Sequence, residues 1–181
     1  MLSRITTIAA AAAALGALAL SPTAASAQAE NLPTATATVH NADGEELGTV
    51  IFTATPSGMT HVAIKLEGLP SGAHGFHVHE TGVCDAADGF QSAGGHYAGD
   101  KEHGVLVEGG PHPGDFPNIH VAPDGVVVVQ YFTDQLSVGS EGENPLADED
   151  GSAVMVHAGP DDYESQPAGD AGSRIACGVI E

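Results

Sequence analysis

The sequence predicts an all-β fold, an antiparallel sandwich or barrel in which long loops carry the function. Two observations predict it: short β-forming runs are separated by turn signals, and no segment beyond residue 27 shows the 3.6-residue period of a capped helix. Turns are predicted at Asn41-Ala42-Asp43-Gly44 and at Pro123-Asp124-Gly125. Several short strands joined by such turns are typical of antiparallel sandwiches and barrels.

The expected strands follow from local patterns. Residues 34–39 alternate threonine with small apolar residues, which is the two-residue period of a strand. Residues 153–156 form a continuous apolar run, which predicts a strand that ends at His157. In chain order, strands are predicted at 34–39, 48–54, 61–66, 75–79, 125–132, 153–157 and 175–180.

Long stretches between these segments resist strand assignment, namely residues 80–118, and residues 139–152 together with 159–172. Loops of this length in a compact domain are usually functional. The first stretch contains three histidines, so we expect function there. Because the chain shows no internal repeat or linker, residues 28–181 are predicted to form a single domain.

Residues 1–27 are predicted to be a cleaved export signal. Arg4 precedes an apolar, alanine-rich stretch from Ile8 to Leu20, and Ala25-Ser26-Ala27 is similar to a signal peptidase site. A short membrane anchor is the alternative, but a spanning helix needs about 20 apolar residues and Pro22 interrupts the run. A Sec-type signal of this kind predicts a periplasmic protein, or a fully secreted one, with no membrane attachment after cleavage.

The chain is strongly acidic. It has 24 Asp and Glu residues against 4 Lys and Arg, and one of those four, Arg4, lies in the predicted signal. The remaining cations are Lys65, Lys101 and Arg174. This charge excludes nucleic acid and anionic membranes as partners, because both would be repelled. The hydrophobic content of 42% argues against disorder.

Cys84 and Cys177 are the two cysteines of the chain. Since an exported protein folds in an oxidising compartment, we expect them to form a disulfide. Two free thiols, or two soft metal ligands, are the alternatives. A bridge would close a long loop and would stabilise the fold by restricting the unfolded chain.

The most informative segment is Gly75-Phe76-His77-Val78-His79. In a strand, His77 and His79 project to one side about 7 Å apart, because side chains alternate between the two faces. Two imidazoles on a rigid element suit copper or zinc. An isolated pair of this kind is more often two solvated residues, so the interpretation depends on the other histidines.

Further histidines and one carboxylate complete a two-metal pattern: His96, His103, His112, Asp115 and His157. The glycines before His96 let backbone approach a crowded site. His112-Pro113-Gly114-Asp115 places an imidazole and a carboxylate across a tight turn, which suits one tetrahedral ion. The loop histidines alone could be ordinary polar surface residues. Together with Asp115 and the rigid pair, they predict metal binding.

Five motifs occur in order along the chain: Gly75-Phe76-His77-Val78-His79-Glu80, Ser92-Ala93-Gly94-Gly95-His96, Gly110-Pro111-His112-Pro113-Gly114-Asp115, Val156-His157-Ala158-Gly159-Pro160-Asp161-Asp162 and Gly172-Ser173-Arg174-Ile175-Ala176-Cys177-Gly178-Val179-Ile180. Together they resemble the copper–zinc superoxide dismutases of the bacterial periplasm, over essentially the whole chain after the signal. The resemblance implies a Greek-key sandwich or barrel. It also implies dismutation of superoxide to dioxygen and hydrogen peroxide.

The resemblance implies a role for each matching residue. Copper would be bound by His77, His79, His96 and His157. A structural zinc ion would be bound by His96, His103, His112 and Asp115. The imidazolate of His96 would therefore bridge both ions, and His96 would also take and return a proton in catalysis. Arg174 would guide the anion, Asp161 would link a copper histidine to a zinc histidine, and the bridge of Cys84 to Cys177 would tie the ligand loop to the strand that begins near Arg174.

One spacing departs from the family pattern, because the interval from His96 to His103 is one residue shorter than the resemblance leads us to expect. Four histidines match no ligand position and are predicted to be structural or solvated: His40, His61, His74 and His120. The family resemblance is compatible with a monomer or a homodimer.

Other kinds of protein remain as alternatives. A periplasmic copper- or zinc-binding module would need neither Arg174 nor a shared ligand. A catalytically silent adhesion sandwich would need no metal ligands. A copper-only relative of the enzyme would lack His112 or Asp115, and both are present.

Overall fold

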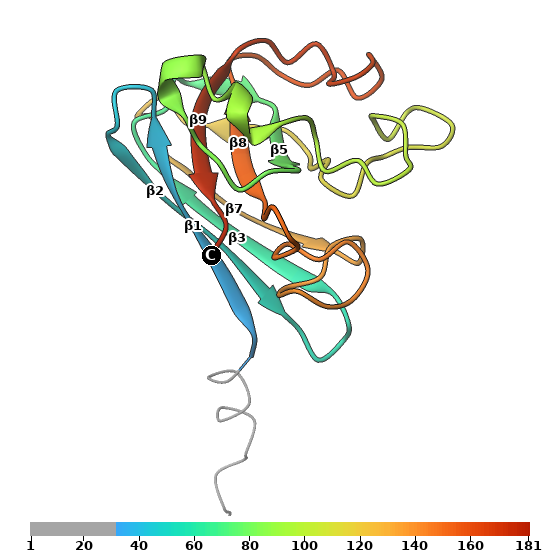
Figure 1. Ribbon diagram of the computed structural model, residues 1–181. Helices are drawn as coiled ribbons and strands as arrows, with labels where there is room; N and C mark the ends of the chain where they lie inside the picture. Colours follow the sequence, from blue (N-terminus) through green and yellow to red (C-terminus); the bar gives the residue numbers. More distant parts are fainter. Residues whose placement is uncertain (1–31) are drawn as a thin grey trace, which may run out of the picture. The chain divides into compact units, whose positions relative to one another are not determined.

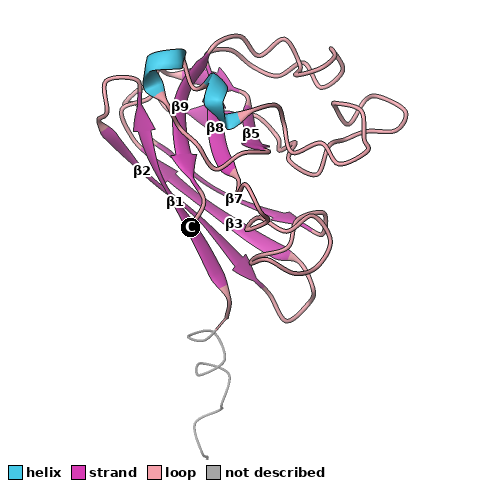
Figure 2. Cartoon of the chain, viewed as in Figure 1, coloured by secondary structure: helices cyan, strands magenta, loops and turns pink. Residues whose placement is uncertain are grey.

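The computed structural model describes residues 32–181, so the predicted signal at residues 1–27 lies outside the described part. The described chain is all-β, with nine strands and two short 3-10 helices, as the sequence predicted (Figures 1 and 2). Within residues 32–181, no helix has the length and apolar character that crossing a membrane requires.

Seven strands form one antiparallel sheet in the order β5-β8-β9-β1-β2-β3-β7. Their bounds are β1 Thr34–Asn41, β2 Glu46–Ala54, β3 Thr60–Leu66, β5 Phe76–His79, β7 Val127–Thr133, β8 Ala153–His157 and β9 Arg174–Val179. These confirm the seven predicted strands to within about two residues at each end. A separate pair, β4 (Gly72–His74) with β6 (Ile119–Val121), was not predicted, because three residues are too few to show a period.

The sheet is curled, and its inner faces share one hydrophobic core. Along β1 and β3, buried residues alternate with more exposed ones, as expected for strands with one face in the core. Phe52 and Ile64 from one part of the sheet lie in the same buried cluster as Phe76, Val78 and Val154 from the other. The sheet therefore curls around this core.

Strands β5 and β8 are buried on both faces. Phe76 and Val78 point into the core, so His77 and His79 lie on the opposite face, which the loops cover. The loop segment at Tyr97 runs along β5, since the Tyr97 amide donates to the Val78 carbonyl at 2.8 Å. The Val78 amide in turn donates to the Gly114 carbonyl at 2.9 Å. The loops thus turn the outer face of β5 into an enclosed site.

A disulfide between Cys84 and Cys177 is present, as predicted, with the two Cα atoms 5.8 Å apart. It joins the loop after β5 to β9. The loop carries the 3-10 helices η2 (Ala86–Asp88) and η3 (Gln91–Ala93), which lie against β9 in Figure 1. A second small buried cluster forms beneath them, from Phe90, Ala93, Ala153, Met155 and Cys177.

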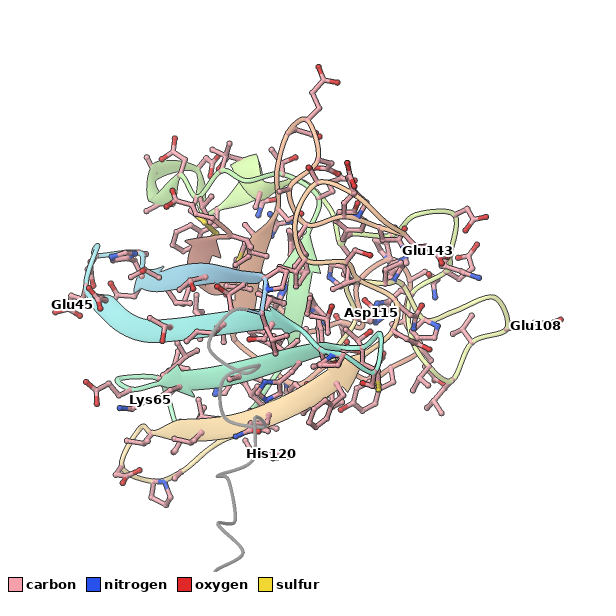
Figure 3. The ribbon with its side chains drawn as sticks, turned by 90° about the horizontal axis from the view of Figure 1, so that it is seen from below. Glu45, Lys65, Glu108, Asp115, His120 and Glu143 are labelled. Carbon is pink, nitrogen blue, oxygen red and sulfur yellow. A yellow bond between two sulfur atoms is a disulfide. The ribbon has the colours of Figure 1, made fainter. Side chains whose placement is uncertain are left out.

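The remaining long loops gather on one side of the sheet. In Figure 1, residues 97–118 and residues 158–173 lie beside one another, and the Leu106 amide donates to the Tyr163 carbonyl at 3.2 Å. In Figure 3, Glu108 and Glu143 project from the loops on the side where Asp115 lies, and Lys65 lies on the other side of the view. These loops contain residues with no regular secondary structure beyond turns and bridges, in agreement with the sequence prediction.

Candidate metal centre

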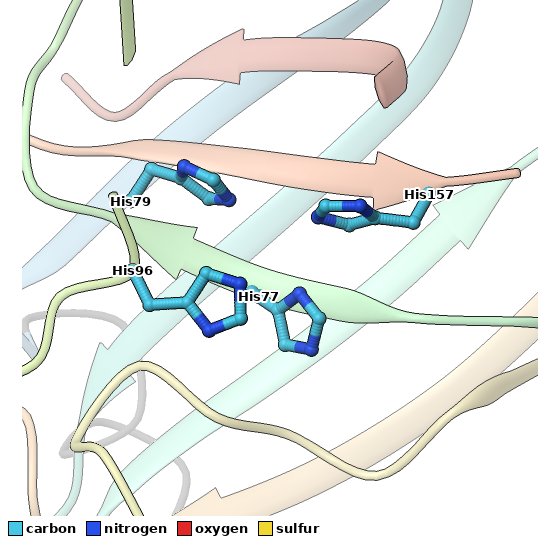
Figure 4. Close-up of side chains that lie close together, drawn as sticks. All are labelled: His77, His79, His96 and His157. Atoms are coloured by element: carbon cyan, nitrogen blue, oxygen red, sulfur yellow. The ribbon is translucent and has the colours of Figure 1, made fainter. Parts of the chain in front are cut away.

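Four histidines meet beside β5. His77 and His79 come from β5 itself, His157 ends the neighbouring strand β8, and His96 lies on the loop segment that bridges to His79. Figure 4 shows their rings around one shared space. Their exposed fractions are 0%, 0%, 4% and 6% for His77, His79, His157 and His96. One ligand nitrogen from each lies within 4.8 Å of the others.

Each of these rings uses one nitrogen to bond the protein. His77 Nε2 lies 2.7 Å from Asp161 Oδ2, and His96 Nδ1 lies 2.9 Å from Asp115 Oδ1. His79 Nδ1 lies 3.1 Å from the Gly94 carbonyl oxygen and His157 Nδ1 lies 3.2 Å from that of Gly172. These contacts fix both the plane of each ring and the nitrogen that remains free.

The other nitrogen of each ring is buried without a hydrogen-bond partner: His77 Nδ1, His79 Nε2, His96 Nε2 and His157 Nε2. A buried polar atom left unpaired costs free energy, so four of them converging on one space need an explanation. A bound cation would supply it. Four imidazole nitrogens form a donor set that suits copper.

A second group lies on the other side of His96 and contains His96, His103, His112 and Asp115, again with ligand atoms within 4.8 Å of one another. His103 Nδ1 lies 3.1 Å from Asp115 Oδ2, and His112 Nδ1 lies 3.3 Å from Asp115 Oδ1. His112 and Asp115 are joined by a turn, in which the Asp115 amide donates to the His112 carbonyl at 3.1 Å. Three imidazoles and one carboxylate make a closed four-ligand set that suits structural zinc.

Burial keeps His79, His96 and His157 of the first group neutral. Desolvation by burial lowers the pKa of His79 to about 2, that of His157 to about 3 and that of His96 to about 4. At neutral pH these rings therefore hold a lone pair ready for a metal ion. His79 and His157 could therefore bind a cation at no cost in deprotonation.

In the second group, hydrogen bonds favour the charged forms of Asp115 and His103. Burial opposes charge on Asp115, but hydrogen bonds from His103, His112 and His96 outweigh it and hold the pKa of Asp115 well below its ordinary value. Burial also disfavours protonated His103, but the hydrogen bonds to Asp115 and Asp161 raise its pKa to about 9. In the metal-free chain a proton on His103 thus balances two carboxylates, and a divalent ion takes its place on binding.

Arg174 begins β9 and lies close to the four-histidine group. Its Nη1 donates to the Phe90 carbonyl and its Nη2 to the Gly94 carbonyl, each at 2.6 Å. The Gly94 oxygen is also the partner of His79 Nδ1, so one carbonyl orients both side chains. A guanidinium has five N–H donors, so donors remain for an anion.

The comparisons with known proteins agree with this geometry. The family model for copper/zinc superoxide dismutase matches residues 46–180. The chain belongs to this family. The superoxide dismutase (Cu-Zn) 1 of Aquifex aeolicus is 46% identical over 149 residues, which cover 80% of this chain and 86% of that protein. The superoxide dismutase (Cu-Zn) of Caulobacter vibrioides is 43% identical over 150 residues, which cover 81% of this chain and 85% of that protein.

Solved structures show the same fold. The Cu/Zn superoxide dismutase from Brucella abortus has a TM-score of 0.65 and 35% identity, covering 82% of this chain and 99% of that one. A SOD-like protein from Bacillus subtilis has a TM-score of 0.76 and 34% identity, and the match covers 81% of this chain and 97% of that one. Copper/zinc superoxide dismutases are oxidoreductases that use copper and zinc, and the two groups of side chains are where this dismutase could hold them.

Asp161 links the two groups of this dismutase. One carboxylate oxygen lies 2.7 Å from His77 Nε2, and the other lies 3.1 Å from His103 Nε2. Asp161 is held in turn by Asn118, whose side-chain oxygen accepts from the Asp161 amide at 2.8 Å and whose Nδ2 donates to the Asp161 carbonyl at 2.9 Å. Asn118 could not be predicted from the sequence, because a single asparagine in a loop carries no spacing signal.

The histidines outside the two groups have other surroundings. His74 is buried, with its ring nitrogens 2.8 Å from the carbonyl oxygens of His157 and Pro70. His61 Nε2 lies 2.9 Å from the Gln130 side chain of the neighbouring strand, and its ring stacks on Phe132. His120 is exposed on β6. None of these belongs to a metal-ligand group of the described chain.

Proposed function

We propose that this chain dismutates superoxide to dioxygen and hydrogen peroxide, with copper bound by His77, His79, His96 and His157 and zinc bound by His96, His103, His112 and Asp115. The observation that carries the proposal is that His96 belongs to both groups. Its Nδ1 faces Asp115 and its Nε2 is the unpartnered atom beside the other three histidines. A single imidazolate would then bridge the two ions.

When bound, copper would supply the one-electron chemistry and zinc would act as a structural ion that also polarises His96. The protein residues supply the rest. Arg174 would hold the superoxide anion beside the four histidines with the donors that its backbone contacts leave free. His96 would take a proton from water at Nε2 and give it to the reduced product, and water would supply the second proton of hydrogen peroxide. Asp115 and Asp161 would keep the imidazoles oriented.

We also propose that the mature protein begins near residue 28 and functions in the periplasm. The disulfide supports an oxidising compartment, and the N-terminal sequence has the pattern of an export signal. Superoxide is the partner that the site fits, and the acidic surface does not suit nucleic acid.

The test is metal analysis of periplasmically expressed protein together with a dismutation assay. We expect one copper and one zinc per chain, and dismutation that is lost on chelation and restored by both metals. A metal-binding module without enzymatic function would take up the metals and leave superoxide undismutated. That result would refute the proposal and favour the alternative.

A further inference from the structure

The side chain of Gln166 reaches across to the loop that carries His103. Gln166 Oε1 accepts from the His103 amide at 3.0 Å, and Gln166 Nε2 donates to the His103 carbonyl at 2.8 Å. The same Nε2 also donates to the Glu164 carbonyl at 3.1 Å. Although Gln166 lies on the surface, its amide group is thus held by three backbone contacts.

His103 needs such a partner. Its side chain is fully buried, and neither its amide nor its carbonyl makes another hydrogen bond within residues 32–181. Backbone groups at a buried position cost free energy when they are unpaired. The side-chain amide of Gln166 pairs with both the amide and the carbonyl of His103, as the backbone of a residue in a neighbouring strand would.

We infer that Gln166 is a positioning residue for the zinc site. This inference rests on the function proposed above, in which His103 is a zinc ligand. The His103 ring contacts Asp115 through Nδ1 and Asp161 through Nε2, so its plane is set by two carboxylates. Gln166 sets the backbone from which that ring projects. The two constraints together fix where Nδ1 meets the ion.

The contact also joins two loops. Gln166 belongs to the segment 158–173, which carries Asp161 and lines a cavity of about 520 Å³ beside His157. Gly169 in this segment has a φ of +68°, and a Cβ there would collide with the Asp161 carboxylate and the His103 ring. The segment therefore packs directly on His103. The Gln166 contact thus ties the segment beside His157 to the loop that carries His103.

The experiment compares metal affinities of the full chain after removal of its metals. Gln166→Met keeps a side chain of similar length and removes all three hydrogen bonds. Gln166→Ala removes the side chain beyond Cβ. If the two variants behave alike, the effect does not come from the methionine itself. Ser165→Ala is the matched control, because it removes a hydrogen bond of the same loop to Asp162 without touching His103. Zinc and copper affinities are measured by competition with chromophoric chelators, and Co²⁺ absorption reports the geometry of the zinc site.

We expect both Gln166 variants to weaken zinc binding about tenfold or more, as is typical when a partner of a metal ligand is lost. Copper affinity should change less than twofold, the Co²⁺ spectrum should shift, and Ser165→Ala should behave like the wild type. Zinc affinity within twofold of the wild type in both Gln166 variants, or equal weakening in Ser165→Ala, overturns the inference. If the wild type itself binds no zinc, or His103→Ala leaves zinc binding unchanged, the proposed function fails and this inference with it.

Discussion

At the scale of single residues, the four-histidine group depends on how each ring uses its two nitrogens. In His77, His79 and His157, one nitrogen bonds a carbonyl or carboxylate of the protein and the other is buried without a partner. His96 differs, because it belongs to both groups. The side chains that meet in the two groups could be predicted from the sequence, because His77 and His79 occupy alternate positions of a strand and His112 and Asp115 span a tight turn. Asn118 and Gln166 could not, because the contacts of a lone amide side chain depend on how distant loops meet.

We expect His157→Ala to remove copper and dismutation while zinc stays bound and the fold stays intact. The reason is geometric: His157 belongs to the four-histidine group alone, whereas His96 belongs to both. Metal content of the purified variant is the measurement. Loss of zinc equal to the loss of copper would refute the division of the ligands into two sites.

We expect Asp115→Ala to act mainly on zinc. The carboxylate lies within 3.3 Å of three ring nitrogens, and its loss opens a closed site and leaves His103 with one carboxylate partner. Zinc affinity and thermal stability should both fall, since binding free energy of a structural ion adds to folding free energy. Some activity should remain at neutral pH. Full zinc occupancy after dialysis against a moderate chelator would show that Asp115 is not a ligand.

At the scale of elements, the sheet supplies a rigid base and the loops supply the enclosure. Seven strands were predictable because their alternation or apolar runs span five or more residues in most cases, while β4 and β6 are too short to show either. The long loops were recognisable only by the absence of a pattern. Their paths depend on contacts between distant segments, such as Tyr97 with Val78 and the disulfide of Cys84 with Cys177.

Reduction of the disulfide should lower the free energy of unfolding by a few kcal/mol. The two cysteines are separated by 93 positions, and the chain-entropy model sets an upper value of about 4.7 kcal/mol for a loop of about that length. Activity should fall too, because Arg174 contacts the carbonyls of Phe90 and Gly94 in the tethered loop. Denaturant titrations of the oxidised and reduced protein measure the first effect. Two free thiols in the unfolded, unreduced protein would contradict it.

At the scale of the whole molecule, the net negative charge of the protein repels the superoxide anion. The chain carries 24 acidic residues, and Lys65 lies on β3, away from the loops around Asp115 (Figure 3). Among the residues that line the cavity beside His157 there is one carboxylate, Asp170, and no lysine or arginine. Lys101 lines a different pocket, together with Asp100, Asp134 and Glu143. We therefore expect attraction of superoxide to come at short range, from the metal ion and Arg174.

The rate should consequently rise, or stay constant, as ionic strength increases from 0.01 M to 0.15 M. The Debye length falls over this interval from ~30 Å to ~8 Å, so salt screens the distant carboxylates before it screens Arg174. Steady-state dismutation rates across the salt series are the measurement, and Arg174→Glu should lose activity at every point. A steep decrease of the wild-type rate would show that a local positive potential steers the anion.

The most direct test of the account is anomalous diffraction from crystals of the metal-loaded chain, recorded at the copper and zinc absorption edges. We predict two peaks about 6 Å apart, the separation set by one imidazole with a metal–nitrogen bond of about 2 Å at each nitrogen. Copper should lie among His77, His79, His96 and His157, and zinc among His96, His103, His112 and Asp115. A single ion, or copper and zinc peaks that do not share His96 as a ligand, would contradict the account.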